Sequence, residues 1–324
     1  MSENEIYASI DLGGTKIAGM LATADGRVVA EKTMPTLSQE GPHVVLGRMA
    51  GVILDLADEV GHRPTAVGLG VPGLIDMTNG VTRFLPNLPT QWIDVPVRAA
   101  LEPQIECPVY LLNDARMATL GELVFGHGRT ANTMVYFTLG TGIGGGVVVD
   151  GKLRLGPLGA AGELGHQTIL PDGPLCGCGN RGCMETLATG PVLTSRGVWL
   201  LHSGRAPRLH EIVEGDPARV NPREMGRAAA AGDESVRDEI LTAAGYLGIG
   251  VANLVTALHP DLVVFSGGMS DLGPLLFDTV RATVRRRVRM FPADDVRIER
   301  SLLAEKAGMW GGIALAMRRG RVNS

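Results

Sequence analysis

The sequence predicts an α/β protein of two domains, and three observations support this prediction. Predicted strands and helices alternate along most of the chain, as they do in proteins of this class. At 324 residues the chain is long enough for two domains, each with its own core. A block of strand, glycine-rich loop, strand and Asp-Gly turn occurs twice, near residue 13 and again near residue 140. We therefore expect two related halves, each of which presents a glycine hairpin to a shared cleft.

The first half of the chain combines strands with two helices. Asp25-Gly26 is a strong hairpin signal after the second strand, and apolar residues at helical spacing mark the longer helix. The expected strands are 6–10, 17–22, 28–31, 66–71 and 109–112, and the expected helices are 43–60 and 115–125. Between the last two strands lies a proline-rich stretch that we expect to be a loop.

The second half opens with the repeated glycine block and ends in a helix. The expected strands are 134–138, 147–149, 261–265 and 296–301, and the expected helices are 224–231, 236–258, a basic helix that includes 281–289, and 305–319. Residues 186–235 show little pattern apart from the first of these helices.

Composition and charge restrict the function. The chain has 45% hydrophobic and 20% charged residues, which is typical of globular rather than disordered proteins. A net charge of −4 gives no basic footprint for nucleic acid. The acidic N-terminus does not resemble a signal or transit peptide, and no apolar run approaches the ~18 residues of a membrane span. We expect a cytoplasmic protein with reduced thiols that binds neither nucleic acid nor membrane.

Cysteine and histidine spacing predicts a metal site. Three of the four cysteines fall within eight residues, and one imidazole with three thiolates is the ligand set of a closed structural zinc site. The predicted ligands are His166, Cys176, Cys178 and Cys183. Glu163 and Glu185 flank them, so an ion that fixes this loop also fixes two carboxylates. The alternative is a loop of buried thiols; two neighbouring disulfides are disfavoured because cysteines one residue apart rarely reach bridging geometry.

The two glycine loops predict phosphate binding. Gly140-x-Gly142-x-x-Gly145 matches the dinucleotide-binding fingerprint, but a strand follows it where that fingerprint requires a helix. No Gly-x4-Gly-Lys-Ser/Thr sequence marks a P-loop. What remains is two hairpins of small residues, whose exposed backbone N–H groups can bind phosphate oxygens. Ordinary tight turns are the alternative.

Two aspartates at strand ends are placed to carry chemistry beside such a cleft. The carboxylate of Asp11 can hold Mg²⁺ directly or through water. Asp114 follows Asn113 at the end of another strand, where it is placed as the general base for an acceptor hydroxyl. The alternative for each is structural: Asp11 caps its turn, and Asn113 or Asp114 caps the following helix.

These motifs together resemble those of the ROK (repressor, open reading frame, kinase) family of sugar kinases and sugar-responsive repressors. The resemblance covers nearly the whole chain. Its motifs are Asp11-Leu12-Gly13-Gly14-Thr15-Lys16, Gly70-Val71-Pro72-Gly73, Asn113-Asp114, the loop from Leu139 to Gly146, Gly162-Glu163-Leu164-Gly165-His166 and the block from Cys176 to Glu185. The cysteine block is highly specific, whereas the first motif is shared with many actin-like ATPases.

The resemblance implies an actin-like (ribonuclease H-like) fold, with two α/β domains around a cleft for nucleotide and sugar. It places residues 1–117 and 305–324 in a smaller domain, and residues 118–304 in a larger domain with the zinc loop. The implied roles are Asp114 as catalytic base; Gly73, Asn87, Asn113, Asp114, Glu163, His166 and Glu185 on the sugar; and Asp11, Gly13, Gly14, Thr15, Lys16, Gly140, Thr141, Gly142, Gly267 and Gly268 on the nucleotide. The implied cofactors are ATP, Mg²⁺ near Asp11 and a structural Zn²⁺.

From this resemblance we expect an ATP-dependent hexokinase, a glucokinase that makes glucose 6-phosphate for glycolysis. N-acetylmannosamine, N-acetylglucosamine, mannose and fructose stay open as substrates, and so does polyphosphate as donor. A sugar-sensing repressor is the alternative of another class, but family repressors carry an additional N-terminal DNA-binding segment, and the first strand here begins almost at Met1. An NAD-dependent dehydrogenase has only the glycine match in its favour. The family expectation for assembly is a homodimer or homotetramer.

Overall fold

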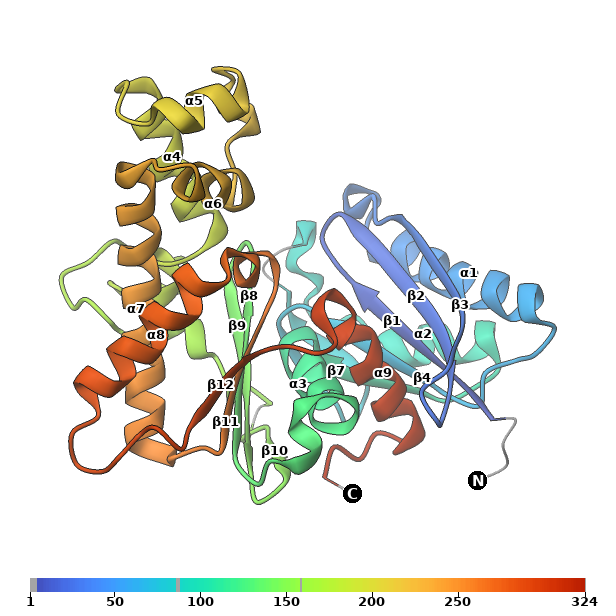
Figure 1. Ribbon diagram of the computed structural model, residues 1–324. Helices are drawn as coiled ribbons and strands as arrows, with labels where there is room; N and C mark the ends of the chain where they lie inside the picture. The colour runs from blue at the N-terminus through green and yellow to red at the C-terminus, as the bar shows by residue number, and fades with distance from the viewer. Residues whose placement is uncertain (1–4, 86–87, 158, 324) are drawn as a thin grey trace. The chain divides into compact units, whose positions relative to one another are not determined.

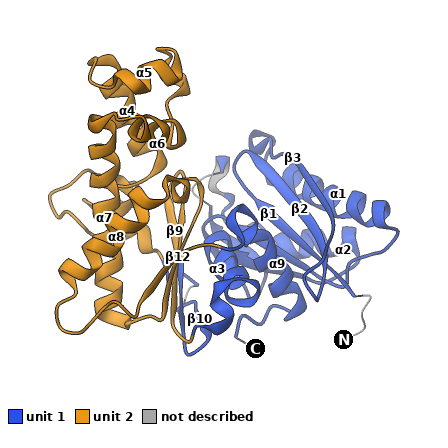
Figure 2. Cartoon of the chain, in the orientation of Figure 1, with its two compact units in different colours: residues 1–131, 146–162, 302–324 blue, residues 132–145, 163–301 orange. Residues whose placement is uncertain are grey.

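The computed structural model describes residues 5–85, 88–157 and 159–323 (Figure 1). The chain forms two compact units, and neither is one continuous stretch of sequence (Figure 2). Unit 1 contains residues 1–131, 146–162 and 302–324, and unit 2 contains residues 132–145 and 163–301. Sheets and helices occur together in both units, so the predicted α/β class is confirmed.

The sheet of unit 1 has the strand order β3-β2-β1-β4-β7. Its strands are β1 (Ile6–Leu12), β2 (Lys16–Thr23), β3 (Val28–Pro35), β4 (Val67–Val71) and β7 (Val109–Asn113). β1, β2 and β3 are antiparallel neighbours, whereas β4 runs parallel to β1 and β7 runs parallel to β4. Because parallel strands end at the same edge of a sheet, Asp11 and Asn113 lie at one edge.

Helices pack on this sheet and form two cores. The helices of the unit are α1 (Pro42–Val60), α2 (Val97–Ile105), α3 (Asp114–Phe125) and α9 (Ala307–Met317). Successive side chains of a strand point to opposite faces. Accordingly, Ile10 of β1 belongs to the core that contains α1, and Tyr7 belongs to a second core with Met309 and Ile313 of α9.

Glycines allow α9 to lie directly against its neighbours. A Cβ at Gly311 would collide with the main-chain carbonyl of Met117 in α3, and a Cβ at Gly68 of β4 would collide with that of Gly312. Two backbones approach this closely only where no side chain intervenes. The last helix of the chain is therefore built into unit 1.

The second sheet has the strand order β10-β9-β8-β11-β12. Its strands are β8 (Met134–Leu139), β9 (Ile143–Val149), β10 (Lys152–Arg154), β11 (Leu262–Ser266) and β12 (Arg297–Arg300). The division between the units falls within β9. The helices of unit 2 are α4 (Gly190–His202), α5 (Pro207–Val213), α6 (Pro222–Ala230), α7 (Glu234–Leu258) and α8 (Pro274–Arg287). α4, α5 and α6 gather at one end of α7, and α8 lies along it (Figure 1).

Helix α7 is long and apolar. Among the residues that the structure describes, it is the one helix whose length and composition would allow it to cross a membrane, with a mean hydropathy of 1.6. Half of that stretch is buried inside the protein, and Ile240, Leu247 and Val251 are fully covered. The core helix of a folded domain has the same properties, and we interpret α7 as one.

The structure contains elements that the sequence did not predict. The proline-rich stretch follows a small separate sheet of β5 (Leu74–Asp76) and β6 (Val81–Phe84), and contains helix α2. Helices α4 and α5 lie in the stretch that showed little pattern. The domain boundary that we predicted after residue 117 falls inside α3. All of α3 belongs to unit 1, where it packs on α9. Unit 1 has more residues than unit 2.

Candidate functional site

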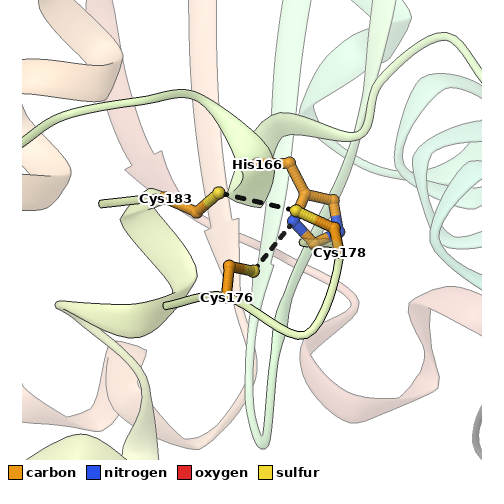
Figure 3. Close-up of side chains that lie close together, drawn as sticks. All are labelled: His166, Cys176, Cys178 and Cys183. Carbon is orange, nitrogen blue, oxygen red and sulfur yellow. Dashed lines mark hydrogen bonds between the residues drawn. The ribbon is translucent and has the colours of Figure 1, made fainter. Parts of the chain in front are cut away.

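The four predicted zinc ligands lie together in unit 2. The Sγ atom of Cys176 lies 3.6 Å from Nδ1 of His166, and the Sγ atoms of Cys178 and Cys183 are 3.7 Å apart (Figure 3). All four donor atoms lie within 4.8 Å of one another. Zn–S bonds of about 2.3 Å in a tetrahedral site put sulfur atoms roughly 3.8 Å apart. The donor set and its spacing therefore fit a structural zinc ion.

Two glycines shape the loop that carries the cysteines. Gly179 and Gly182 have φ angles of 91° and 64°, in the region that favours glycine. A Cβ at Gly182 would also collide with the carbonyl group of Leu170. The backbone N–H of Cys176 donates to the carbonyl oxygen of Asn180 at 2.7 Å, which closes the turn. The local sequence thus brings the three sulfurs to one point.

The pKa values of two cysteines reflect how closely the thiol groups lie in this loop. All four cysteines of the chain are free of disulfide bonds. Burial, together with the neighbouring cysteines, raises the pKa of Cys183 to about 12, whereas a backbone hydrogen bond at Asn180 lowers the pKa of Cys178. Three thiolates in one site repel one another, and a divalent cation between them removes this penalty.

Glu163 lies beside this cluster. Its Oε2 atom is 3.9 Å from Nε2 of His166, the ring nitrogen that does not face Cys176. A metal-binding histidine commonly directs its other nitrogen at a carboxylate, which fixes the orientation of the ring. The Glu163 side chain is 45% exposed. One predicted sugar ligand and the predicted zinc site are therefore neighbours through His166.

Glu185 connects the cysteine loop (residues 176–183) with the second glycine loop (residues 139–146). Its Oε2 atom accepts a hydrogen bond of 2.8 Å from the backbone N–H of Ile143. A Cβ at Gly142 would lie 2.6 Å from the same oxygen, so the absence of a side chain lets the carboxylate reach the loop. The N–H of Gly140 donates to the carbonyl of Gly142 at 3.0 Å and closes the hairpin. A predicted sugar ligand thus holds a predicted phosphate loop in place.

A cavity of about 610 Å³ opens beside this loop, within unit 2. Its walls come from the glycine loop, from α4 and the start of α6, and from the turn after β11. The lining residues are Leu139, Gly140, Thr141, Gly190, Pro191, Thr194, Ser195, Asn221, Pro222, Arg223, Gly268, Met269 and Asp271. The volume is in the range of small-molecule and cofactor sites, and a glycine loop at its edge suits a nucleotide.

Sequence reasoning found only part of this cavity. Gly140, Thr141 and Gly268 were predicted as nucleotide ligands and line it. Gly267 is not among the lining residues that the structure describes; its φ of 85° and the adjacent carbonyl of Leu139 require glycine for backbone reasons. The walls from α4 and α6 were missed because residues 186–235 carry no motif that marks them.

The first glycine loop lies in unit 1, between β1 and β2. The N–H of Gly13 donates to the carbonyl of Lys16 at 2.9 Å, and Oγ1 of Thr36 donates to the carbonyl of Gly13 at 2.7 Å. Gly14, Thr15 and Lys16 are exposed. The loop is therefore a closed hairpin with its tip in solvent.

Asp11 lies at the end of β1, beside this loop. Its carboxylate is half-buried between β4 and α9, where a Cβ at Gly70 or Gly308 would approach it to 3.5 or 3.7 Å. Burial raises the pKa of Asp11, and the charge of Lys16 opposes this effect. No hydrogen bond reaches the carboxylate from the described part of the chain. A buried, ionised carboxylate without a hydrogen bond destabilises the folded protein unless a cation binds it. Asp11 therefore fits a magnesium site.

Asn113 and Asp114 begin helix α3 in unit 1. Oδ1 of Asn113 accepts hydrogen bonds from the N–H groups of Ala115 and Arg116 at 3.1 and 3.2 Å, so Asn113 is the N-cap of the helix. Its Nδ2 donates to the carbonyl of Gly73 at 3.1 Å. Oδ1 of Asp114 accepts from the N–H of Ala115 at 2.8 Å. The capping alternative is thus confirmed for Asn113, and Asp114 occupies the first turn, where the helix dipole stabilises a carboxylate.

The predicted site residues divide between the two units. Unit 1 holds Asp11, Gly13, Gly14, Thr15, Lys16, Gly73, Asn113 and Asp114, and unit 2 holds Gly140, Thr141, Gly142, Glu163, His166, Cys176, Cys178, Cys183, Glu185, Gly267 and Gly268. Asn87, a predicted sugar ligand, lies outside the described residues.

Comparison with known proteins identifies the family. The ROK family model matches residues 7–319. A glucokinase of Thermotoga maritima is 36% identical over 316 residues, which cover 96% of this chain and 96% of that protein. A xylose repressor of Caldicellulosiruptor bescii is 32% identical over 311 residues, which cover 95% of this chain and 77% of the repressor. The crystal structure of a ROK family glucokinase from Streptomyces griseus, in complex with glucose and AMPPNP, matches with a TM-score of 0.84 and 31% identity, and covers 97% of this chain and 99% of that one. The chain therefore belongs to the ROK family and has the actin-like ATPase fold that its motifs implied.

Proposed function

We infer that this chain is an ATP-dependent glucokinase, which transfers the γ-phosphoryl group of ATP to the 6-hydroxyl of glucose. The hydrogen bond between Glu185 and Ile143 carries this inference, because it joins a predicted sugar ligand to the glycine loop of a nucleotide-sized cavity. The likeness to the glucokinase of Thermotoga maritima, and to the Streptomyces griseus enzyme that was solved with glucose and AMPPNP, supports glucose and ATP as the substrates.

Asp114 is the proposed general base. Its carboxylate takes the proton of the sugar 6-hydroxyl as that oxygen attacks the γ-phosphorus. The Asn113 cap fixes the start of α3, and the bond to the N–H of Ala115 orients the carboxylate. A base that acts only as the hydroxyl attacks contributes to kcat rather than to sugar affinity.

Fixed polar groups are proposed to bind the sugar. A carboxylate can accept two hydroxyl hydrogen bonds in a defined geometry, and His166 brings Glu163 close to the zinc ligands. The proposed sugar ligands are Gly73, Asn87, Asn113, Asp114, Glu163, His166 and Glu185.

The two glycine loops are proposed to bind phosphate oxygens through backbone N–H groups. Asp11 would hold Mg²⁺, which offsets the negative charge of the phosphates when it is bound. The proposed nucleotide ligands are Asp11, Gly13, Gly14, Thr15, Lys16, Gly140, Thr141, Gly142, Gly267 and Gly268. His166 and the three cysteines would hold zinc in a structural role, because four protein ligands leave no position for a substrate.

A sugar-responsive repressor is the second candidate, and the identity with the xylose repressor favours it. If the chain is a repressor, it should bind a sugar without transferring a phosphoryl group. Among kinases, an N-acetylmannosamine or N-acetylglucosamine kinase is the alternative, and a coupled assay with a panel of hexoses and N-acetylhexosamines separates these substrates. We further propose a cytoplasmic homodimer or homotetramer, as the family resemblance implies.

The substitution Asp114→Ala tests the inference. We expect kcat with glucose and ATP to fall by roughly 10²–10⁴-fold, because a positioned base contributes about this much, while calorimetry shows that glucose still binds. Asp58→Ala, at an exposed position of α1, is the control and should keep full turnover. Near-normal turnover in Asp114→Ala would refute the base assignment, and sugar binding without any turnover in the wild type would favour the repressor.

A further inference from the structure

Arg116 is a buried arginine in the first turn of α3, two positions after the proposed base. Only 1% of its surface is exposed. Its Nη1 atom donates to Oδ1 of Asn113 at 3.2 Å, and its Nη2 atom donates to the carbonyl oxygen of Ala160 at 3.0 Å. All three residues belong to unit 1. The sequence did not single out Arg116, because an arginine in a helix is ordinarily solvated.

This position is unfavourable for a positive charge. Burial removes the hydration of the guanidinium group, and apolar side chains of similar size can fill such a space without that penalty. The N-terminus of a helix carries a partial positive charge, so cations are favoured at the other end. The groups to which Arg116 donates therefore explain why an arginine occupies this position.

The guanidinium group joins the start of α3 to a distant segment, because Ala160 lies 44 residues after Arg116 in the chain. One is the N-cap Asn113, which is also bonded to Gly73. The other is the segment 159–162, which leads directly into the proposed sugar ligand Glu163. A planar fork of donors can bind both groups at once in a fixed geometry.

The segment 159–162 depends on such bonds for its path. Gly159 and Gly162 have φ angles of 70° and 98°, and glycine imposes little preference of its own on the backbone. The N–H of Ala161 donates to the carbonyl of Leu155 at 2.9 Å. The bond from Arg116 to Ala160 ties this segment to the start of α3.

We propose that Arg116 is a positioning residue for sugar phosphorylation, which fixes Asn113 and the start of α3 to the segment that leads into Glu163. The proposal rests on the proposed kinase function. Arg116 is buried and acts through protein groups such as Asn113 and Ala160 rather than through the substrate. We expect the loss of Arg116 to weaken sugar binding and to displace the proposed base Asp114, and to leave the KM for ATP unchanged.

Arg116→Met keeps the length of the side chain and removes its donors. We expect kcat/KM for glucose to fall roughly 10- to 100-fold, since small misplacements of reacting groups have effects of this size. Hydrogen exchange without substrate should show faster exchange of the amides of residues 159–162. Arg116→Lys offers a point charge in place of a fork and should recover only part of the loss; it carries the same test if the Met variant does not fold.

Arg98→Met is the matched control. Arg98 also lies in unit 1 and donates to main-chain carbonyls, those of Met77, Thr78 and Val109. Its substitution should lower the Tm without changing the KM for glucose or the exchange of residues 159–162.

Three results would overturn the proposal: wild-type kinetics in Arg116→Met, unchanged exchange of residues 159–162, or an equal kinetic loss in Arg98→Met. If the wild type phosphorylates no sugar, the proposed function fails, and the exchange measurement still decides whether Arg116 holds the segment.

Discussion

Gly142 and Gly140 occupy the same loop but have different surroundings. Oε2 of Glu185 lies 2.6 Å from the place of a Cβ at Gly142, whereas a Cβ at Gly140 would meet no atom within 4 Å. Neither residue has a positive φ. Glycine is therefore needed at Gly142 for a contact with a side chain 43 positions away, a need that the glycine pattern alone does not show.

Gly142→Ala should raise the KM for glucose by roughly 10-fold, because the methyl group displaces a carboxylate that is proposed to bind the sugar. Gly140→Ala adds a methyl group in the same loop and should leave the KM for glucose unchanged. Steady-state kinetics with glucose varied at saturating ATP distinguishes them. Equal KM values for glucose in the two variants would contradict the role assigned to Glu185.

Asp11 should lower the stability of the protein in the absence of Mg²⁺ and nucleotide. Its folded-state pKa is raised by burial, so the folded state keeps the proton to higher pH than the unfolded state does. The resulting penalty is absent below the unfolded pKa of 3.8, grows as the pH rises, and is complete above the folded pKa.

Asp11→Asn should therefore raise the Tm by about 2 °C or more at neutral pH. The difference in Tm between the variant and the wild type should become smaller as the pH falls below the folded-state pKa of Asp11. The same variant should lose roughly 10²-fold or more in kcat, because the proposed magnesium ligand is gone. Thermal unfolding at about pH 8 and about pH 5, with kinetics, tests both parts. A lower Tm for Asp11→Asn across this range would show that the carboxylate is stabilised in the folded protein.

The cysteine loop acts as one element. Removing one ligand should release the ion, and the loop should then no longer hold Glu163 and Glu185 in place. We expect Cys178→Ser to lose zinc on elemental analysis and to bind glucose more weakly in calorimetry. Even the loss of a group that only orients a metal ligand typically lowers metal affinity by about 10- to 100-fold, and we expect the loss of a ligand to lower it at least as much.

Cys107→Ser is the control for this element. Cys107 is half-buried in unit 1, and burial raises its pKa to about 11, so it stays an uncharged thiol at neutral pH. Its substitution should leave the zinc content at one ion per chain. Zinc content that is the same in both variants would mean that Cys178 is not a ligand.

At the scale of the whole molecule, the chain passes from one unit to the other several times. Unit 1 is completed by α9, whose residues Ile313 and Ala316 are fully buried. Helix α9 packs on β1, β4 and α3, which come from the first part of the chain. One face of the unit 1 sheet is therefore covered by α9, whereas the other face packs on α1.

A chain that ends at Ser301 should not unfold cooperatively, because one face of the unit 1 sheet would be exposed to water. Each large apolar side chain that is uncovered removes about 1.5–3 kcal/mol of burial. A chain that ends at Val322 keeps α9 and should unfold at the wild-type temperature. Circular dichroism of both proteins during heating gives the comparison, and a wild-type Tm for the shorter chain would show that α9 is dispensable.

Much of the fold could be predicted because its signals are local. The apolar runs of β1, β8 and β11 and the helical spacing in α1 and α7 reflect the period of each element. Helix α5 was missed because it has only seven residues. Helix α4 was missed because its buried face includes Gly197, a residue of low helix propensity. The hairpin β5–β6 was missed because prolines nearby favoured a loop.

The sequence by itself determined the family, the α/β class, the cluster of one histidine and three cysteines, and the glycine loops. The signal for each of these lies in residues close together in the sequence, because ligand type, turn geometry and helix caps are local requirements. Only the tertiary structure decided that Glu185 binds the N–H of Ile143, that α4 and α6 wall the cavity, and that Arg116 bonds to Ala160. Such contacts join residues far apart in the chain, and a hydrogen bond to a distant backbone group leaves no pattern in the sequence around either partner.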